Sequence, residues 1–300
     1  MTKAVFTTKV DPTYDDLPEE RYQFPRTYLR QAEAAVGDWI VYYEPRRTSG
    51  DLSSRGGRQA YFATAKVDRI EPDPIRADRF YAFVSGYLEF ERAVFFKEGE
   101  HYFEGGLARA DGKTNKGAFG RAVRFIPDAE YDLILQAGFV RTIGEISNAV
   151  PKGGEDHSGF SEEQLSYGRP IVERMISRPF REAAFALGVK EAYANTCAMT
   201  GFSIINGGGR AEVQAAHIRP VARDGPDSIR NGLALSGTIH WMFDRGLVSI
   251  DENYSILVAR NRLPDPVSRM LRDKLLLPDR PDRRPHAQFL RYHRNQIFKG

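Results

Sequence analysis

Three short stretches decide the fold of the C-terminal half of the chain: Ala215-Ala216-His217-Ile218-Arg219-Pro220, Asn231-Gly232-Leu233-Ala234-Leu235 and His240-Trp241-Met242-Phe243-Asp244. Asn231 follows His217 by 14 residues, His240 follows Asn231 by 9, and Asp244 follows His240 by 4. The local pattern predicts a strand, a turn-rich loop, a second strand and a helix. His217 then projects from a strand, while His240 and Asp244 share one face of the helix.

These residue types suit hydrolysis of a phosphodiester. The reaction needs a base that activates water, a Lewis acid that takes up charge on the phosphate, and a frame that holds both. His240 and Asp244, four residues apart on a helix, can share a divalent ion. Asn231 can fix the loop backbone through side-chain hydrogen bonds.

Residues from about Pro179 to Ala259 resemble the HNH endonucleases of the ββα-metal fold. The three stretches, continued by Arg245-Gly246, look like the subgroup found in bacterial restriction enzymes. The resemblance implies that His217 is the general base and that Asn231 fixes the loop of the catalytic site. It also implies that His240 and Asp244 bind the metal, Mg²⁺ or Mn²⁺.

The sequence departs from this family at two places. Many members carry an acidic or His metal ligand immediately before the catalytic His, where Ala216 cannot coordinate an ion. Two protein ligands completed by water and substrate oxygens suit Mg²⁺ or Mn²⁺ better than tightly held Zn²⁺. Many members also bind a structural zinc through two Cys pairs, and the corresponding positions here are Cys197, Thr200, Ser236 and Ile239. We therefore expect no structural zinc.

Length and composition fit two globular domains. The chain has 300 residues, of which 41% are apolar, enough to bury a core in each domain. We find no run of about 18 apolar residues that could span a bilayer, and a soluble cytoplasmic protein is expected. The single cysteine, Cys197, excludes an internal disulfide and a site built from several thiolates.

Positive charge is concentrated near the C-terminus. The net charge is only +3, but residues 259–300 hold eleven Lys and Arg against four Asp and Glu, a surplus of +7. This segment can contact phosphates or can be a solvated, arginine-rich tail. Arg219 and Arg223, close to His217, can likewise clamp DNA phosphates or form surface salt bridges.

Residues 1–140 predict a β-rich domain. Short segments rich in aromatic and β-branched residues, at 38–43, 58–67 and 81–84, alternate with turn residues and indicate a small barrel. A helix is expected at 128–138 and another at 179–193, with a β-hairpin across 247–258. We divide the chain into a domain at 1–140, a linker and helix at 141–178, with a flexible stretch at 151–159, and a domain at 179–300.

The N-terminal domain also resembles a known superfamily. The stretches that carry the likeness are Tyr14-Asp15-Asp16-Leu17-Pro18, Tyr22-Gln23-Phe24-Pro25 and Val36-Gly37-Asp38-Trp39-Ile40-Val41-Tyr42-Tyr43-Glu44-Pro45-Arg46-Arg47. They look like the PUA superfamily, in particular the EVE or ASCH-like readers that are fused to HNH nucleases in modification-dependent restriction enzymes. The implied fold class is α+β, with a PUA-like barrel before a ββα-metal domain.

That resemblance implies a site for a modified cytosine, 5-methylcytosine or 5-hydroxymethylcytosine, flipped out of double-stranded DNA. Trp39, Tyr42 and Tyr43 are candidates for stacking on the base and Asp38 for its exocyclic amine. Trp39 and Tyr43 share a face of the strand and Tyr42 points away, so at most one set lines a pocket. The alternative is that these aromatic residues form the barrel core.

Two cations of the first domain, Arg46 and Arg58, can follow the DNA backbone or belong to a solvated loop. The leading hypothesis is a modification-dependent restriction endonuclease that acts as a homodimer, because one centre cuts one strand. An HNH nuclease acting on unmodified DNA or RNA, and a nucleic-acid binding module without catalysis, stay open as alternatives.

Overall fold

The computed structural model describes residues 2–8, 17–45, 58–149 and 177–300. These residues form two compact units, one of Met1–Gly86 with Phe90–Ala184 and one of Tyr87–Glu89 with Phe185–Gly300. Each unit has its own buried apolar core. The predicted flexible stretch at 151–159 and Arg46 lie outside the described residues. The boundaries of the three predicted segments stay predictions.

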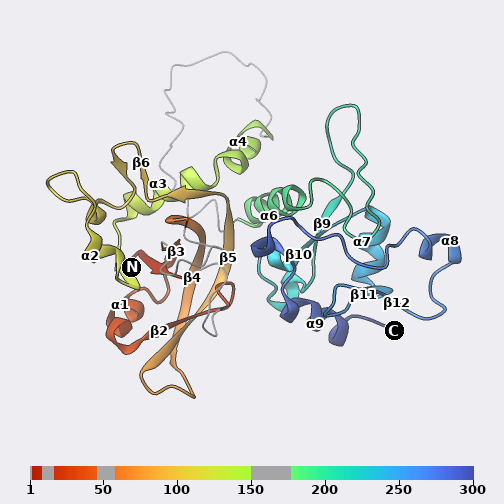
Figure 1. Cartoon of the computed structure of the whole chain (residues 1–300), viewed down its shortest axis with the longest axis horizontal. Coiled ribbons are helices and arrows are strands. Elements are labelled where there is room, and N and C mark those ends of the chain that lie inside the picture. Colours follow the sequence, from red (N-terminus) through yellow and green to blue (C-terminus); the bar gives the residue numbers. More distant parts are fainter. Residues whose placement is uncertain (1, 9–16, 46–57, 150–176) are drawn as a thin grey trace, which may run out of the picture. The chain divides into compact units, whose positions relative to one another are not determined.

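The first unit is built on a six-stranded sheet with the order β2-β5-β4-β3-β1-β8. The strands are β1 (Ala4–Thr7), β2 (Arg21–Pro25), β3 (Trp39–Glu44), β4 (Ala60–Pro72), β5 (Arg79–Phe95) and β8 (Val123–Phe125). β1 runs parallel to β3 and antiparallel to β8, whereas the β2–β5 and β3–β4 pairs are antiparallel. Figure 1 shows β4 and β5 as the long strands of this sheet. The three predicted strands are confirmed as β3, β4 and β5.

The sheet is curled into a half-barrel with open edges, which agrees in part with the predicted small barrel, and the PUA-like assignment stays a prediction. β2 and β8 are its outer strands and are not paired with each other. The phenol of Tyr22 on β2 instead donates to the carbonyl oxygens of Thr7, at 3.0 Å, and of Ala122, at 3.3 Å. Its ring lies 4.9 Å from that of Phe6. Side-chain contacts around an aromatic core, rather than a backbone ladder, hold the two edges together.

Short helices and one small ribbon complete this unit. They are η1 (Arg26–Tyr28), α1 (Leu29–Ala34), β6 (Lys97–Glu98), β7 (His101–Tyr102), η2 (Gly105–Leu107), α2 (Lys116–Phe119), α3 (Asp128–Gly138) and α4 (Val140–Ala149). α3 confirms the helix predicted at 128–138, and the phenol of its Tyr131 lies 2.7 Å from the hydroxyl of Thr64 on β4. α4 occupies the beginning of the region predicted as linker and helix.

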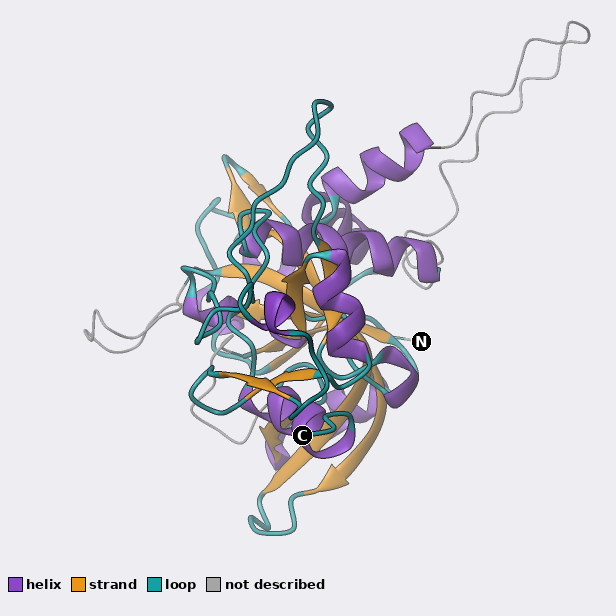
Figure 2. Ribbon diagram, turned by 90° about the vertical axis from the view of Figure 1, so that its right-hand side faces the viewer, coloured by secondary structure: helices purple, strands orange, loops and turns teal. Residues whose placement is uncertain are grey.

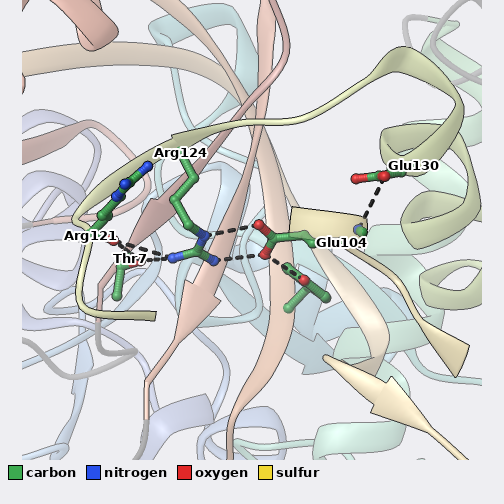
Figure 3. A network of polar contacts seen from close by, with 7 residues as sticks. Thr7, Glu104, Arg121, Arg124 and Glu130 are labelled. Carbon is green, nitrogen blue, oxygen red and sulfur yellow. Dashed lines mark hydrogen bonds and ion pairs between the residues drawn. The ribbon is translucent and has the colours of Figure 1, made fainter. Parts of the chain in front are cut away.

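A buried ion pair ties β8 to the loop that precedes η2 (Figure 3). Arg124 donates to both carboxylate oxygens of Glu104, at 2.9 and 2.7 Å, and a third nitrogen–oxygen contact of 2.8 Å joins it to Thr7. Tyr61 donates to the same carboxylate at 2.6 Å, and burial, followed by the charge of Glu104, raises the pKa of Tyr61 well above its ordinary value. Because each buried charge has its partner, the network fixes one arrangement of these segments.

The second unit follows the order predicted from the sequence. Its elements are α6 (Arg178–Ala192), which begins just before it, β9 (Gln214–His217), η3 (Val221–Arg223), η4 (Ile229–Asn231), β10 (Gly232–Leu235), α7 (Gly237–Asp244), β11 (Val248–Ile250), β12 (Ile256–Val258), α8 (Asp265–Ser268), η5 (Pro281–Arg283) and α9 (Ala287–Gln296). β9 and β10 are antiparallel, with His217 opposite Gly232, and β11 pairs with β12 as the predicted hairpin. Helices and strands alternate with long loops, as the colours of Figure 2 make clear. Among the described helices, none is both long enough and apolar enough to cross a membrane.

The basic C-terminal segment folds back onto this unit through α9. Phe289 and Leu290 are buried, and the ring of His293 stacks on that of Phe243 at 3.7 Å. His293 contacts the hydroxyl of Ser249 at 2.9 Å and donates from Nε2 to the carbonyl oxygen of Phe243 at 3.1 Å. Burial lowers the pKa of His293 to about 4, so this imidazole is held neutral. The segment is therefore a structural part of the unit.

This buried imidazole predicts a pH-dependent stability. The pKa of His293 is about 4 in the folded protein, and its ordinary value is 6.5. Between these two values His293 is protonated in the unfolded chain but not in the folded one. The contribution is fully present above the unfolded pKa, and the free energy of unfolding falls as the pH drops toward the folded pKa, by up to about 3 kcal/mol. Urea unfolding of the wild type and His293→Gln from pH 7 to pH 5 should show a shallower fall in the variant. Equal slopes would contradict the assignment.

Candidate active site

His217 lies at the end of β9 in a fixed orientation. Its Nε2 is 2.9 Å from a carboxylate oxygen of Asp227, and its ring stacks on Phe185 with centroids 3.8 Å apart and 12° between the planes. The His217 side chain is 18% exposed and that of Asp227 is 5% exposed. The imidazole therefore has one side against the protein and one edge open to solvent.

The position of Asp227 selects the tautomer of His217. A carboxylate accepts a hydrogen bond, so the proton sits on Nε2 and the lone pair on Nδ1. Within the described part of the chain, Nδ1 makes no hydrogen bond. An imidazole with a buried carboxylate on one nitrogen and the other nitrogen left without a hydrogen bond is the arrangement that a general base needs.

Asn231 is fully buried and holds the loop between β9 and β10 closed. Its side-chain oxygen accepts from the backbone nitrogen of Arg219 at 2.9 Å. Its amide nitrogen donates to the carbonyl oxygens of Arg219, at 3.0 Å, and of Pro226, at 2.9 Å. The Arg219 contacts lie two residues beyond His217 and the Pro226 contact one residue before Asp227. One amide thus fixes both ends of the loop that joins His217 to Asp227.

Two glycines allow the close approaches on which this geometry depends. A Cβ at Gly225 would lie 1.8 Å from the carbonyl oxygen of Arg219, inside the closed loop. A Cβ at Gly232 would lie 2.3 Å from a methyl group of Val189 and 3.1 Å from the ring of Phe185. Gly232 therefore lets α6 come close enough for Phe185 to stack on His217.

His240 and Asp244 lie together on the exposed side of α7. His240 Nε2 is 3.5 Å from an oxygen of Asp244, which is too long for a strong hydrogen bond. Nδ1 of His240 is 2.8 Å from the side-chain oxygen of Gln214 on β9. Gln214 thereby orients the imidazole and leaves the Nε2 lone pair directed toward the carboxylate.

This pair fits a divalent ion. Two atoms bound to one ion at about 2.1 Å each lie at most about 4.2 Å apart, and the observed separation is within that limit. No cluster of three or more His, Cys, Asp or Glu side chains suited to a metal occurs in the residues that the structure describes. Water and phosphate oxygens would therefore supply the other ligands, as Mg²⁺ and Mn²⁺ accept readily.

Residues 197–251 match the family model described as HNH endonuclease. This segment is an HNH endonuclease domain. The protein is accordingly a nuclease, and HNH nucleases depend on a metal ion.

Comparison with curated proteins gave no match. Among solved structures, the chain is similar to a "Modification dependent TagI restriction endonuclease" at 16% identity and a TM-score of 0.34, over 98% of this chain and 81% of that chain. A likeness this low does not identify the substrate of the present protein.

Two of the positions that correspond to zinc ligands in many HNH domains, Cys197 and Thr200, lie in a hydrogen-bonded turn, and the other two, Ser236 and Ile239, lie at the start of α7. Cys197 is fully buried, and its carbonyl oxygen accepts from the backbone nitrogen of Gly201 at 2.8 Å. The hydroxyl of Thr200 accepts from the backbone nitrogen of Phe202 at 3.2 Å, and Ile239 is buried in the core. The absence of structural zinc stays a prediction.

The arginines expected at the DNA backbone differ in their surroundings. Arg58 is ion-paired with the buried Glu44. Arg219 donates from Nε to the carbonyl oxygen of Arg223 at 2.7 Å, and its guanidinium lies 5.4 Å from the ring centroid of Tyr292. Arg223 is exposed beside the site. Arg219 and Arg223 belong to the loop that follows His217, and a contact of any of these arginines with DNA stays a prediction.

The four side chains expected to read a base lie in the core of the first unit. Tyr42 and Tyr43 are 0% exposed, Asp38 3% and Trp39 8%. Asp38 is ion-paired with Lys3 and accepts from the backbone nitrogen of Trp39 at 2.7 Å. Burial raises the pKa of Tyr43, whose ring packs 5.3 Å from that of Tyr61. The contacts of these side chains are those of the alternative interpretation, in which aromatic residues fill the core.

Removing the charge of Asp227 is expected to impair catalysis without impairing binding. Asp227→Asn should lower kcat by about 10²- to 10⁴-fold with little change in KM, because Asp227 fixes the tautomer of the base and stabilises its protonated form. Initial rates on a labelled duplex would measure this. The double variant with His217→Ala should be no slower than His217→Ala alone, since the two residues act as one unit. Additive losses would contradict the pairing.

The metal assignment predicts a selective loss of Mn²⁺ binding. Calorimetry should detect one Mn²⁺ site in the wild type and in His217→Ala, and none in His240→Ala. Gln214→Ala should weaken the site by about 10- to 100-fold, because it removes only the group that orients His240. Unchanged binding in His240→Ala, with circular dichroism confirming its fold, would overturn the assignment.

Proposed function

We propose that this protein is a metal-dependent DNA endonuclease in which His217 is the general base and His240 with Asp244 the metal ligands. The observation that carries the proposal is the pairing of His217 with the buried Asp227 in the same small domain that presents the His240–Asp244 pair. A poised base and a place for a cation are the two requirements for hydrolysing a phosphodiester.

In the proposed reaction, Nδ1 of His217 acts as the general base. Nδ1 takes a proton from a water molecule as its oxygen forms a bond to phosphorus, and the bond from phosphorus to the 3′ oxygen breaks. The imidazolium is stabilised by Asp227 through Nε2, and the 3′ oxygen acquires a proton from solvent. When bound at His240 and Asp244, Mg²⁺ or Mn²⁺ supplies positive charge for the phosphate and the departing 3′ oxygen. Asn231 positions both His217 and Asp227 by holding the loop that joins them.

The first unit is proposed to choose the target, a modified cytosine in double-stranded DNA. The support is the resemblance of residues 1–140 to the PUA superfamily, together with a compact unit that is separate from the HNH domain. Because Asp38, Trp39, Tyr42 and Tyr43 are in the core, a flipped base would have to be bound by more exposed groups around the curled sheet. Double-strand cleavage would then need two copies of the chain, since each has one centre.

An open hollow of about 780 Å³ on the first unit supports a contact with DNA. Four cations line it, Lys97, Arg109, Lys113 and Lys116, and the ring of Tyr102 lies among them. Asp111 lies 3.7 Å from Arg109 and 3.9 Å from Lys113, so part of the charge is balanced within the protein. Lys116 has no carboxylate partner among the described residues. A basic concave surface beside an aromatic ring suits a phosphate backbone.

Cleavage of matched substrates tests the proposal. Duplexes of one sequence that contain cytosine, 5-methylcytosine or 5-hydroxymethylcytosine, and an RNA of that sequence, would be offered with Mg²⁺ or Mn²⁺. We expect a modified duplex to be cut faster by about 10- to 200-fold, the usual discrimination of a fitted pocket for one methyl group. His217→Ala, the matched control, should cut none of them.

Each other outcome identifies a different function. Equal rates on modified and plain DNA would remove base reading but leave a DNA nuclease, and preferential cutting of RNA would indicate an RNA nuclease. Tight binding without cleavage dependent on an ion would contradict the catalytic assignment.

A further inference from the structure

α7 exposes a large aromatic side chain directly beside a candidate metal ligand. Trp241 is 58% exposed, whereas Ile239, Met242 and Phe243 of the same helix are at most 3% exposed. The apolar face of α7 is therefore complete without Trp241. A single exposed apolar residue is common on protein surfaces and needs no explanation. Trp241 differs because it lies next to the candidate metal ligands.

Trp241 shares the solvent side of α7 with both candidate metal ligands. Trp241 directly follows His240 and precedes Asp244 by three residues, a spacing at which helix side chains are neighbours. The Asp244 side chain is 57% exposed and that of His240 is 23% exposed. Arg245, the next residue, is exposed as well. An indole, two candidate ligands and a cation thus share one open surface.

A substrate bound at the metal ligands must pass over this surface. The scissile phosphate has to lie within coordination distance of an ion at His240 and Asp244, so the nucleotides attached to it lie within a few ångströms of α7. Trp241, three residues before Asp244 on the same helix, is therefore within reach of a strand cut at this centre.

We propose that Trp241 binds the DNA next to the scissile phosphate, with the indole face against the base of an adjoining nucleotide. This inference rests on the proposed nuclease function and adds a substrate-binding residue to it. An aromatic face stacks on every base because each has a π-surface, so the contact is independent of sequence. It holds the strand at the site, while the first unit selects the target.

The two tryptophans of the chain allow a direct test, because Trp39 is 8% exposed and Trp241 is 58% exposed. Unmodified and 5-methylcytosine duplexes would be titrated into the His217→Ala protein, which binds without cutting. We expect DNA to quench the emission of Trp241, and the quenching to disappear in His217→Ala/Trp241→Phe while affinity is largely kept.

Cleavage kinetics separate binding from chemistry. Trp241→Ala should raise KM by about 10- to 100-fold, with a smaller effect on kcat, and Trp241→Phe should restore most of the loss because it keeps an aromatic face. Met270→Ala removes another exposed apolar side chain of the same unit and should leave both constants unchanged.

The outcomes distinguish this inference from the proposed function. If the wild type cuts DNA but Trp241→Ala has an unchanged KM and DNA does not quench Trp241, the inference is overturned and the nuclease stands. If Trp241→Ala alters the oligomeric state instead, the indole serves a protein interface and the inference is likewise overturned. If the wild type neither binds nor cuts DNA, both fail.

Discussion

The candidate active site depends on one buried amide, the side chain of Asn231. Its three hydrogen bonds join Arg219 at the start of the loop to Pro226 near its end. Without these bonds, buried backbone groups of the loop would have no hydrogen-bond partner, which costs about 1–3 kcal/mol for each group. The same closure sets Asp227 against His217. The residue that fixes the loop is therefore also the residue that brings together the two members of the proposed base.

Steric constraints narrow the arrangement further. Gly225 and Gly232 each stand where a Cβ would collide with a neighbouring atom, one with the loop backbone and the other with α6. The second contact brings Phe185 onto the imidazole of His217, which limits the rotation of the ring without adding a charge. Hydrogen bonding therefore sets the tautomer, and packing sets the plane of the ring. Both constraints come from residues outside the four that the sequence singled out, apart from Asn231.

The sequence predicted the parts of this structure that local patterns determine. Hydrophobic periodicity and turn residues predicted the strand, loop, strand and helix around His217, and four-residue spacing placed His240 beside Asp244. Asp227 and Phe185 were missed because their contacts exist only after the loop closes and α6 docks. A polar residue inside a loop and an apolar residue on a helix carry no local signal of such a role. The open edge of the curled sheet was missed for the same reason, since pairing of its outer strands depends on curvature.

The alanine before His217 has a consequence for the metal. Residues 214 and 216 share a face of β9, and Gln214 on that face contacts His240, so the face is directed toward α7. A carboxylate at Ala216 would extend from that face, but the methyl group supplies no ligand, and among the described residues no third His, Cys, Asp or Glu completes a metal cluster with His240 and Asp244. In the proposed site, one negative charge and two protein ligands would hold a divalent ion weakly until the DNA phosphate added its own oxygens. Metal and DNA would then strengthen the binding of each other, because such coupling is reciprocal. In this proposal the substrate completes the centre that cuts it.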